Sequence, residues 1–250
     1  MPIPNPAPTP ATANNAVLSY LKLRQTIGIM GILLPIVLFF IPLIFTPCKE
    51  MQPSISHYYY TSLHIVFVGM LCVLGAFLIT YRGVEKYENP ISSLAGICCW
   101  GVATFPTPFD TDFKDGCGCQ LVSLLHKMPP AVGYTHFISA TIMLLCFAVI
   151  SFFIFPKHDN KTINLIDPKK TFRNRIYRTC AAIIIVSILI IAYFDFVVKH
   201  QQDGTWLDYT TFIFETTSLW AFGLSWLIKG TYLLPSSSSK WIRALVSFVR

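Results

Sequence analysis

Long apolar runs, each bounded by charged residues, proline or glycine, dominate the pattern of positions along the chain. An α-helix needs about 20 mostly apolar residues to cross the hydrocarbon core of a bilayer. Six runs approach this length, and the third is short because it stops at Pro106 and Pro108. The pattern therefore predicts an all-α fold, a polytopic transmembrane bundle of six helices. The six runs cover residues 26–45, 60–81, 91–107, 132–155, 179–198 and 209–227.

Basic residues test this segmentation, because cytoplasmic loops retain more Lys and Arg than the loops on the other side of a membrane. Of the 19 basic residues, 15 fall before the first run, between the second and third, between the fourth and fifth, or after the sixth. The other segments hold only Lys49, Lys114, Lys127 and Lys199. We therefore expect a multi-pass protein of the inner (plasma) membrane with both termini in the cytoplasm.

The composition agrees with a membrane protein, since 54% of the residues are hydrophobic and only 12% are charged. A water-soluble domain carries about 25% charged residues. The net charge of +7 is mostly explained by the basic residues of the predicted cytoplasmic segments. No basic run is interleaved with aromatic residues, as nucleic-acid binding would require. The lipid bilayer is the expected partner, and nucleic acid is excluded.

Outside the predicted membrane domain of residues 20–230, the two ends of the chain are polar or mixed. Residues 1–19 are rich in Pro, Ala and Asn and uncharged, which predicts a disordered cytoplasmic tail and not a cleavable signal. Residues 231–250 contain a serine linker followed by KWIRALVSFVR. This last stretch is either a short amphipathic helix on the inner leaflet or a frayed end.

The ionisable residues of the predicted spans gather near the outer side. His64, His136, Asp195 and Glu215 all fall in the outer third of their runs, whereas the inner two thirds have essentially no ionisable residue. Such residues are costly in lipid and usually face the bundle interior or a watery cavity. Asp195 has a simpler explanation as well, because an ion pair with Lys199 at the i+4 position would satisfy it.

The predicted outer loops add further polar side chains to this layer. His57 precedes His64 by two helical turns, and Ser54 and Tyr58 lie beside it, while Asp110 belongs to the third loop. Histidines and carboxylates that converge in this way can bind zinc or another divalent transition metal, transfer protons, or hold a polar headgroup. Histidines and tyrosines at the headgroup level also serve as simple interfacial anchors.

Three classes of function fit this outer layer. The first is a metal-dependent hydrolase or transferase acting on a lipid or lipid-linked substrate from the outer leaflet. Its metal ligands would be His57, His64 and His136, its catalytic residues Glu215, His136 and Asp110, and its binding residues Ser54, Tyr58 and Asp195. The second is a transporter or receptor-like binding protein for a proton or small solute. The third is a non-catalytic membrane scaffold subunit whose polar residues satisfy helix ends.

Cysteines and small residues bear on packing. Cys48, Cys117 and Cys119 fall in the predicted outer loops, where Cys48 would pair with Cys117 or Cys119 if that side is oxidising, and would otherwise be a free thiol. Small residues within the runs are expected to let helices approach closely. They are Gly69, Gly75, Ala76, Gly96 and Gly101.

Several strings carry a resemblance to a known family. They are SISHYYYTSLHIVFVGMLCVLGAFLITYRG over residues 54–83, LAG at 94–96, FPT at 105–107, HFISA at 136–140 and ETTSLWAFGLSWLIKG at 215–230. In combination they resemble an uncharacterised family of bacterial six-pass integral membrane proteins, a domain of unknown function. The resemblance implies a polytopic inner-membrane protein and supplies no activity.

A second likeness is one of architecture alone. The superfamily of alkaline ceramidases and progestin and adipoQ receptors is similar in consisting of small helical bundles with histidines and an aspartate around zinc. This chain departs from that pattern, since it has six predicted spans instead of seven and no His-x-x-x-His pair near its C-terminus. The zinc amidase chemistry of that superfamily is therefore only an analogy here.

Overall fold

The computed structural model describes residues 10–45, 51–83, 85–108, 129–160, 168–198 and 206–232, and within these ranges every element is helical. This confirms the predicted all-α class. The long helices are α1 (Pro10–Phe45), α2 (His64–Thr80), α3 (Glu88–Thr104), α5 (Pro130–Val149), α7 (Pro168–Tyr193) and α8 (Thr210–Tyr232), with the short α6 (Phe155–Asn160). Shorter turns are the 3-10 helices η1 (Ser56–Tyr60) and η4 (Trp206–Tyr209) and the π-helices η2 (Ile150–Ile154) and η3 (Phe194–Val198).

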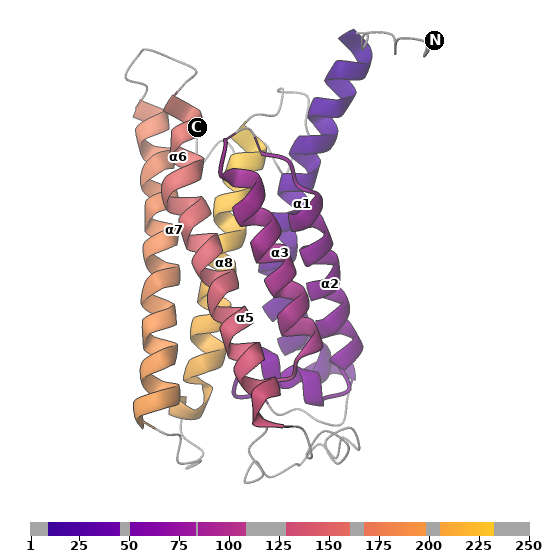
Figure 1. Ribbon diagram of the computed structural model, residues 1–250, viewed down its shortest axis with the longest axis vertical. Coiled ribbons are helices and arrows are strands. Elements are labelled where there is room, and N and C mark those ends of the chain that lie inside the picture. Colours follow the sequence, from indigo (N-terminus) through magenta and orange to yellow (C-terminus); the bar gives the residue numbers. More distant parts are fainter. Residues whose placement is uncertain are drawn as a thin grey trace.

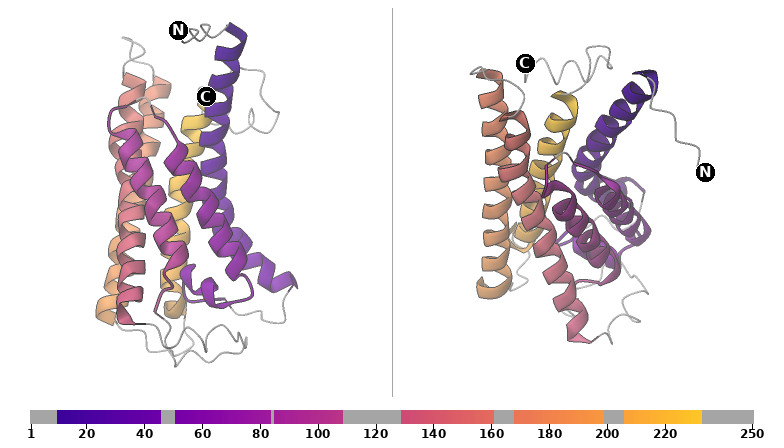
Figure 2. Two further views of the ribbon diagram at one scale, coloured as in Figure 1. Left: turned by 45° about the vertical axis from the view of Figure 1, so that its right-hand side comes forward. Right: turned by 45° about the horizontal axis from the view of Figure 1, so that its top comes forward.

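The long helices run alternately up and down and form a closed ring (Figure 1). Each one packs against the next in the chain, and α8 returns to pack against α1. α5 continues through η2 into α6, and η3 extends α7, so each of these two segments is one long helical rod. The first described residues of α1 and the last of α8 therefore lie at the same end of the bundle (Figures 1 and 2).

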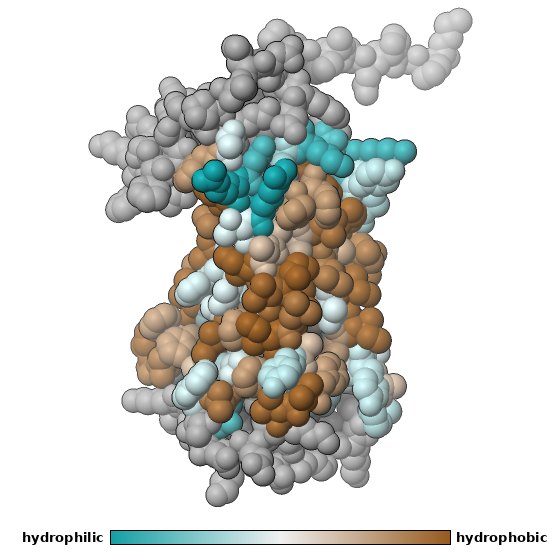
Figure 3. Space-filling model, turned by 90° about the vertical axis from the view of Figure 1, so that its left-hand side faces the viewer, coloured by the Kyte–Doolittle hydropathy of each residue, from teal (hydrophilic) through white to brown (hydrophobic). Residues whose placement is uncertain are grey.

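Three of the helical rods are long and apolar enough to cross a membrane, and α2 is apolar but shorter. They are Leu21–Phe45, Pro130–Lys157 and Thr171–Val198. Their outward faces carry large hydrophobic side chains, which form a broad apolar band with hydrophilic residues gathered above it (Figure 3). A surface of this kind is stable in lipid and not in water. The described chain is thus a helical membrane protein.

Most helices extend beyond the apolar runs that predicted them. α1 begins at Pro10, so residues 10–19 are helical and not disordered as expected. Proline is well suited to the first position of a helix, and the alanines that follow favour helix. Similarly α7 begins at Pro168 and α8 continues to Tyr232, because both helices run on past the charged residues at which the apolar runs end. Arg173 and Lys229 turn inward and are buried, whereas Arg175 and Arg178 are exposed. The expected interfacial helix of the C-terminal segment lies outside the described residues.

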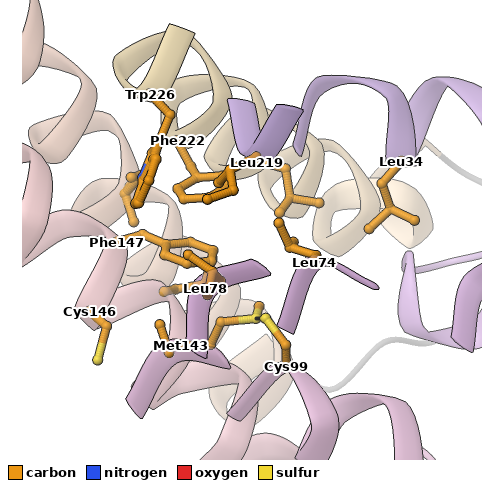
Figure 4. Packing of buried hydrophobic residues seen from close by; sticks show 14 of the residues in the cluster. Leu34, Leu74, Leu78, Cys99, Met143, Cys146, Phe147, Leu219, Phe222 and Trp226 are labelled. Carbon is orange, nitrogen blue, oxygen red and sulfur yellow. Dashed lines mark hydrogen bonds between the residues drawn. The ribbon is translucent and has the colours of Figure 1, made fainter. Parts of the chain in front are cut away.

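Aromatic side chains fill the centre of the ring. The rings of Phe147 on α5 and Phe222 on α8 are stacked with their centroids 3.7 Å apart, and Trp226 packs on Phe222 (Figure 4). Leu78 on α2 and Met143 on α5 belong to the same buried cluster. The bundle interior at this level is consequently packed with apolar side chains.

Two glycine pairs bring neighbouring helices into backbone contact. A Cβ on Gly96 of α3 would lie 2.5 Å from the carbonyl oxygen of Gly75 on α2, and one on Gly223 of α8 would lie 2.6 Å from that of Gly28 on α1. This confirms the packing role predicted for Gly75 and Gly96. The same prediction is wrong for Gly69, which has no neighbouring atom within 4 Å of such a Cβ.

A lipid-exposed tryptophan lies next to each glycine pair. Trp100 Nε1 donates to the carbonyl oxygen of Cys72 at 3.1 Å, and Trp220 Nε1 donates to that of Ile32 at 3.2 Å. Each indole thus finds a hydrogen-bond acceptor on the facing helix and covers the seam between the two helices. The α2–α3 and α1–α8 seams are built in the same way.

The different surroundings of Gly96 and Gly69 predict opposite effects of alanine substitution on stability. Gly96→Ala is expected to destabilise the protein by about 1 to 3 kcal/mol, because its methyl group must displace the α2 backbone. Gly69→Ala is expected to leave stability unchanged or raise it by up to about 1 kcal/mol, since alanine favours helix. Thermal unfolding in detergent measures both. Equal destabilisation by the two substitutions would contradict the close approach of α2 and α3.

Candidate functional site

Residues 51–63, which we name the cap segment, lie across the end of the bundle at which α1 ends and α8 begins (Figure 2). The segment contains η1 and is fastened to several helices. The backbone N–H of Phe212 on α8 donates to the Pro53 carbonyl at 2.9 Å, and the hydroxyl of Tyr60 donates to the Thr107 carbonyl. Tyr58 is buried beside the Phe212 ring. The cap segment is therefore part of the packed structure at this end, which we name the cap end.

His136 and Ser56 form the most suggestive pair at the cap end. His136 Nε2 lies 3.0 Å from Ser56 Oγ, and His136 Nδ1 lies 2.7 Å from the carbonyl oxygen of Phe105. A carbonyl only accepts, so Nδ1 must carry a hydrogen, and in the neutral ring Nε2 is then free to accept the serine proton. A hydroxyl, a base and a group that orients the base are the parts of an activated serine nucleophile.

Glu215 on α8 is the carboxylate of this site. Its Oε2 accepts a hydrogen bond of 2.6 Å from the backbone N–H of Ile55, and the carboxylate also faces the backbone N–H of Ser56. Asp195 of η3 lies near enough to interact with it electrostatically and accepts a 3.0 Å hydrogen bond from Thr211 Oγ1. Glu215 therefore fixes the backbone that carries Ser56. Asp195 was expected to pair with Lys199, which lies outside the described residues, and its described partner is Thr211.

Ser54, His57 and His64 make hydrogen bonds within the cap segment or between it and the start of α2. Ser54 Oγ lies 2.6 Å from His57 Nδ1 and also accepts from the His57 backbone N–H, a bond that closes a turn. His64 Nδ1 lies 2.8 Å from the Tyr59 carbonyl oxygen. Burial raises the pKa of Tyr58 to about 12, so this phenol stays protonated at neutral pH and anchors the segment.

The three predicted metal ligands are not brought together. His57, His64 and His136 belong to three separate hydrogen-bonded groups, and no three His, Cys, Asp or Glu side chains of the described residues form a set that could hold a metal ion. His136 has no ring nitrogen left for a metal ion, because Nδ1 faces the Phe105 carbonyl and Nε2 faces Ser56 Oγ. The remaining predicted residues lie outside the described residues: Cys48, Asp110, Cys117 and Cys119.

A second polar group lies at the opposite end of the bundle, where the sequence predicted basic residues in loops but no buried ionisable group inside the bundle. Arg24 on α1 and Glu88 on α3 are 0% and 1% exposed and form an ion pair of 2.9 Å. The Tyr81 hydroxyl accepts from Arg24 Nε at 2.8 Å and donates to Glu88. Lipid or protein interior penalises an unpaired charge strongly, so these three residues stabilise one another.

Further cations are buried at this opposite end. Lys229 on α8 donates to the Phe155 carbonyl at 2.7 Å and lies over the rings of Phe155 and Tyr177. Arg173 on α7 is also buried. These residues were not predicted to be buried, because each apolar run was taken to end at its first charged residue. A usable signal was the helical spacing of Arg173 and Tyr177, four residues apart and thus on one face.

The fold and these two polar groups define a membrane-embedded helical bundle with a serine–histidine pair between the cap segment and α5. Comparison of the chain with protein-family models, with curated proteins and with solved structures finds no match.

Proposed function

We propose that this chain is a six-pass inner-membrane protein with both termini cytoplasmic, and that its cap end faces the outside. The supporting observations are the alternating directions of the helices and the distribution of basic residues. We further propose that the protein is a hydrolase or transferase that acts on a lipid or lipid-linked ester from the outer leaflet. Ser56 is the nucleophile and His136 the general base.

The observation that carries this proposal is the geometry around His136. Ser56 and His136 are 80 positions apart, yet their side chains lie 3.0 Å apart, and the Phe105 carbonyl holds the ring in the required tautomer. In the reaction, Ser56 Oγ bonds to the ester carbonyl carbon while its proton passes to His136 Nε2. The carbon–oxygen bond to the alcohol then breaks, and His136 returns the proton to the leaving oxygen. Water or a second alcohol releases the acyl group by the same steps.

Access to this pair requires movement of the cap segment. Ser56 is 6% exposed and His136 is 2% exposed. A buried pair excludes water, which protects an acyl-serine intermediate from premature hydrolysis. Tyr58, two residues from Ser56 in the cap segment, packs near the Phe212 ring of α8, and apolar side chains close to the serine suit a lipid substrate better than a free solute.

Labelling with a fluorophosphonate, which reacts with activated serines, tests the proposal. The purified protein in lipid nanodiscs is expected to take up one probe at Ser56, located by peptide mass spectrometry, and Ser56→Ala should abolish it. His136→Gln should slow labelling by about 100-fold or more, the usual contribution of a general base.

Ser54→Ala is the matched control, because Ser54 also contacts a histidine but through a local turn. It is expected to label at the wild-type rate. Absence of label on the wild-type protein, or equal labelling of the Ser56→Ala and wild-type proteins, would contradict a nucleophilic role for Ser56.

A receptor-like protein that responds to protons is the second candidate, and Glu215 is the observation that favours it. The Glu215 side chain holds the cap segment by accepting a hydrogen bond from the Ile55 N–H, and an ionised carboxylate accepts such a bond more strongly than a protonated one. In that case, opening of the cap segment would depend on pH while Ser56 would remain unlabelled at every pH.

A further inference from the structure

The first turns of α7 hold the densest group of cations in the chain. Residues 169–178 contain five basic residues. Of those whose side chains the structure describes, Arg173 faces the bundle and is buried, whereas Arg175 and Arg178 are exposed. Lys157 on the neighbouring α6 is exposed as well. One segment therefore carries both a buried arginine that packs in the bundle and exposed cations at its surface.

Arg175 and Arg178 lie on the side of α7 that faces lipid farther along the helix. Steps of three, four or seven residues lead from them to Val186 and Leu189, which are 52% and 64% exposed. The rod Thr171–Val198 has 28 residues, about 42 Å in length, which exceeds the hydrocarbon thickness of about 30 Å. Its first turns therefore reach the headgroup level with two arginines directed toward lipid.

The adjoining π-helix η2 places exposed aromatic side chains next to these cations. The guanidinium carbon of Arg178 lies 5.8 Å from the centroid of the Phe152 ring, and both Phe152 and Phe153 are exposed. Lys157 follows Phe153 by four residues. Figure 3 shows this side of the molecule, with hydrophilic residues directly above the apolar band. The seam between η2–α6 and α7 thus has cations above and aromatic rings below.

The charge of this side of the molecule favours an anionic occupant. The segments that hold 15 of the 19 basic residues hold only four of the 12 acidic ones: Glu85, Glu88, Asp159 and Asp167. Glu88 is already paired with the buried Arg24. The few remaining carboxylates cannot neutralise the basic residues at this end, whatever their pairing.

We propose that the seam between η2–α6 and α7 is a binding site for an anionic phospholipid of the inner leaflet. The phosphate contacts Arg175, Arg178 and Lys157, and an acyl chain lies along Phe152 and Phe153. A membrane-bound anion fits better than a free one because the cations and the rings are combined in one place. This inference is independent of the Ser56 chemistry, which lies at the other end of the bundle.

Native mass spectrometry of the full chain, released from nanodiscs that contain equal amounts of phosphatidylglycerol and phosphatidylcholine, tests the site. The wild-type protein is expected to retain phosphatidylglycerol preferentially. Arg175→Gln together with Arg178→Gln should weaken that retention about 25-fold, since each cation near anionic lipid contributes on the order of a fivefold preference. Soluble glycerophosphate should not compete.

The matched control is Arg82→Gln together with Lys86→Gln, which removes the same charge from exposed positions between α2 and α3. It should reduce retention less than twofold. Equal loss in both double variants would show a general charge effect and overturn the site, and competition by glycerophosphate would indicate a free-phosphate site instead. If the double variant does not fold, Arg175→Gln alone should still weaken retention about fivefold, and unchanged retention would overturn the proposal.

Discussion

Glu88→Gln is expected to lower the free energy of unfolding by about 3 to 5 kcal/mol, the cost of breaking one side of a buried ion pair. Arg24 is 0% exposed and makes its described ion pair with Glu88, so the substitution leaves the guanidinium facing a neutral amide. The Tyr81 hydroxyl loses its anionic acceptor at the same time. Denaturant or thermal unfolding in detergent, followed by tryptophan fluorescence, measures the loss.

A double variant separates the loss of the pair from the loss of one partner. Arg24→Met combined with Glu88→Leu removes both charges and is expected to be more stable than Glu88→Gln alone, because no charge remains unpaired. Tyr81→Phe should cost about 1 to 2 kcal/mol. A Glu88→Gln protein within about 0.5 kcal/mol of wild type would show that Arg24 is satisfied without Glu88.

Glu215→Ala is expected to release the cap segment without unfolding the bundle. The hydrogen bond of 2.6 Å from the Ile55 N–H to Glu215 joins the segment to α8, and leaving a buried N–H without an acceptor costs about 1 to 3 kcal/mol. Hydrogen exchange of the amides at residues 55–58 should therefore become about 10- to 100-fold faster. Exchange in α5 should stay at the wild-type rate.

Thr217→Ala provides the control for this second prediction. Thr217 lies two residues farther along α8, and its hydroxyl donates to the Ile213 carbonyl of the same helix. Its substitution should leave exchange in the cap segment unchanged. If Glu215→Ala also leaves that exchange unchanged, the contacts of Phe212 and Tyr58 alone hold the segment, and the proton-responsive role of Glu215 is lost.

Much of the architecture was predictable because lipid imposes a simple rule on sequence. The apolar runs placed all of the long helices, and three of the rods are long and apolar enough to cross a membrane. Helix ends were less predictable. α1 and α7 begin well before their apolar runs, because a helix continues through charged residues whether they turn inward, as Arg24 and Arg173 do, or outward, as Arg175 does. A linear pattern does not show which way a charged side chain turns.

The candidate site was predictable in its layer but not in its pairings. Glu215, His136 and Ser54 were correctly placed near one end of the bundle, yet the sequence suggested that three histidines would meet. The structure instead pairs His136 with Ser56, a residue for which the sequence predicted no role. Serine is common and carries no distinctive spacing here, so only the folded contact between α5 and the cap segment reveals it.

The closed ring of helices has a consequence for biosynthesis. Ile32 and its partner Trp220 are 188 positions apart, so the α1–α8 seam cannot form until almost the whole chain has been translated. Until then α1 must remain in the lipid, or beside the insertion machinery, with Gly28 and Gly31 uncovered. Arg24 of α1 finds its ion-pair partner much earlier, because Glu88 is present as soon as α3 has been inserted. The first helix is thus secured at one end early in synthesis, and ribosomes stalled before α8 should yield an open bundle that is more sensitive to detergent.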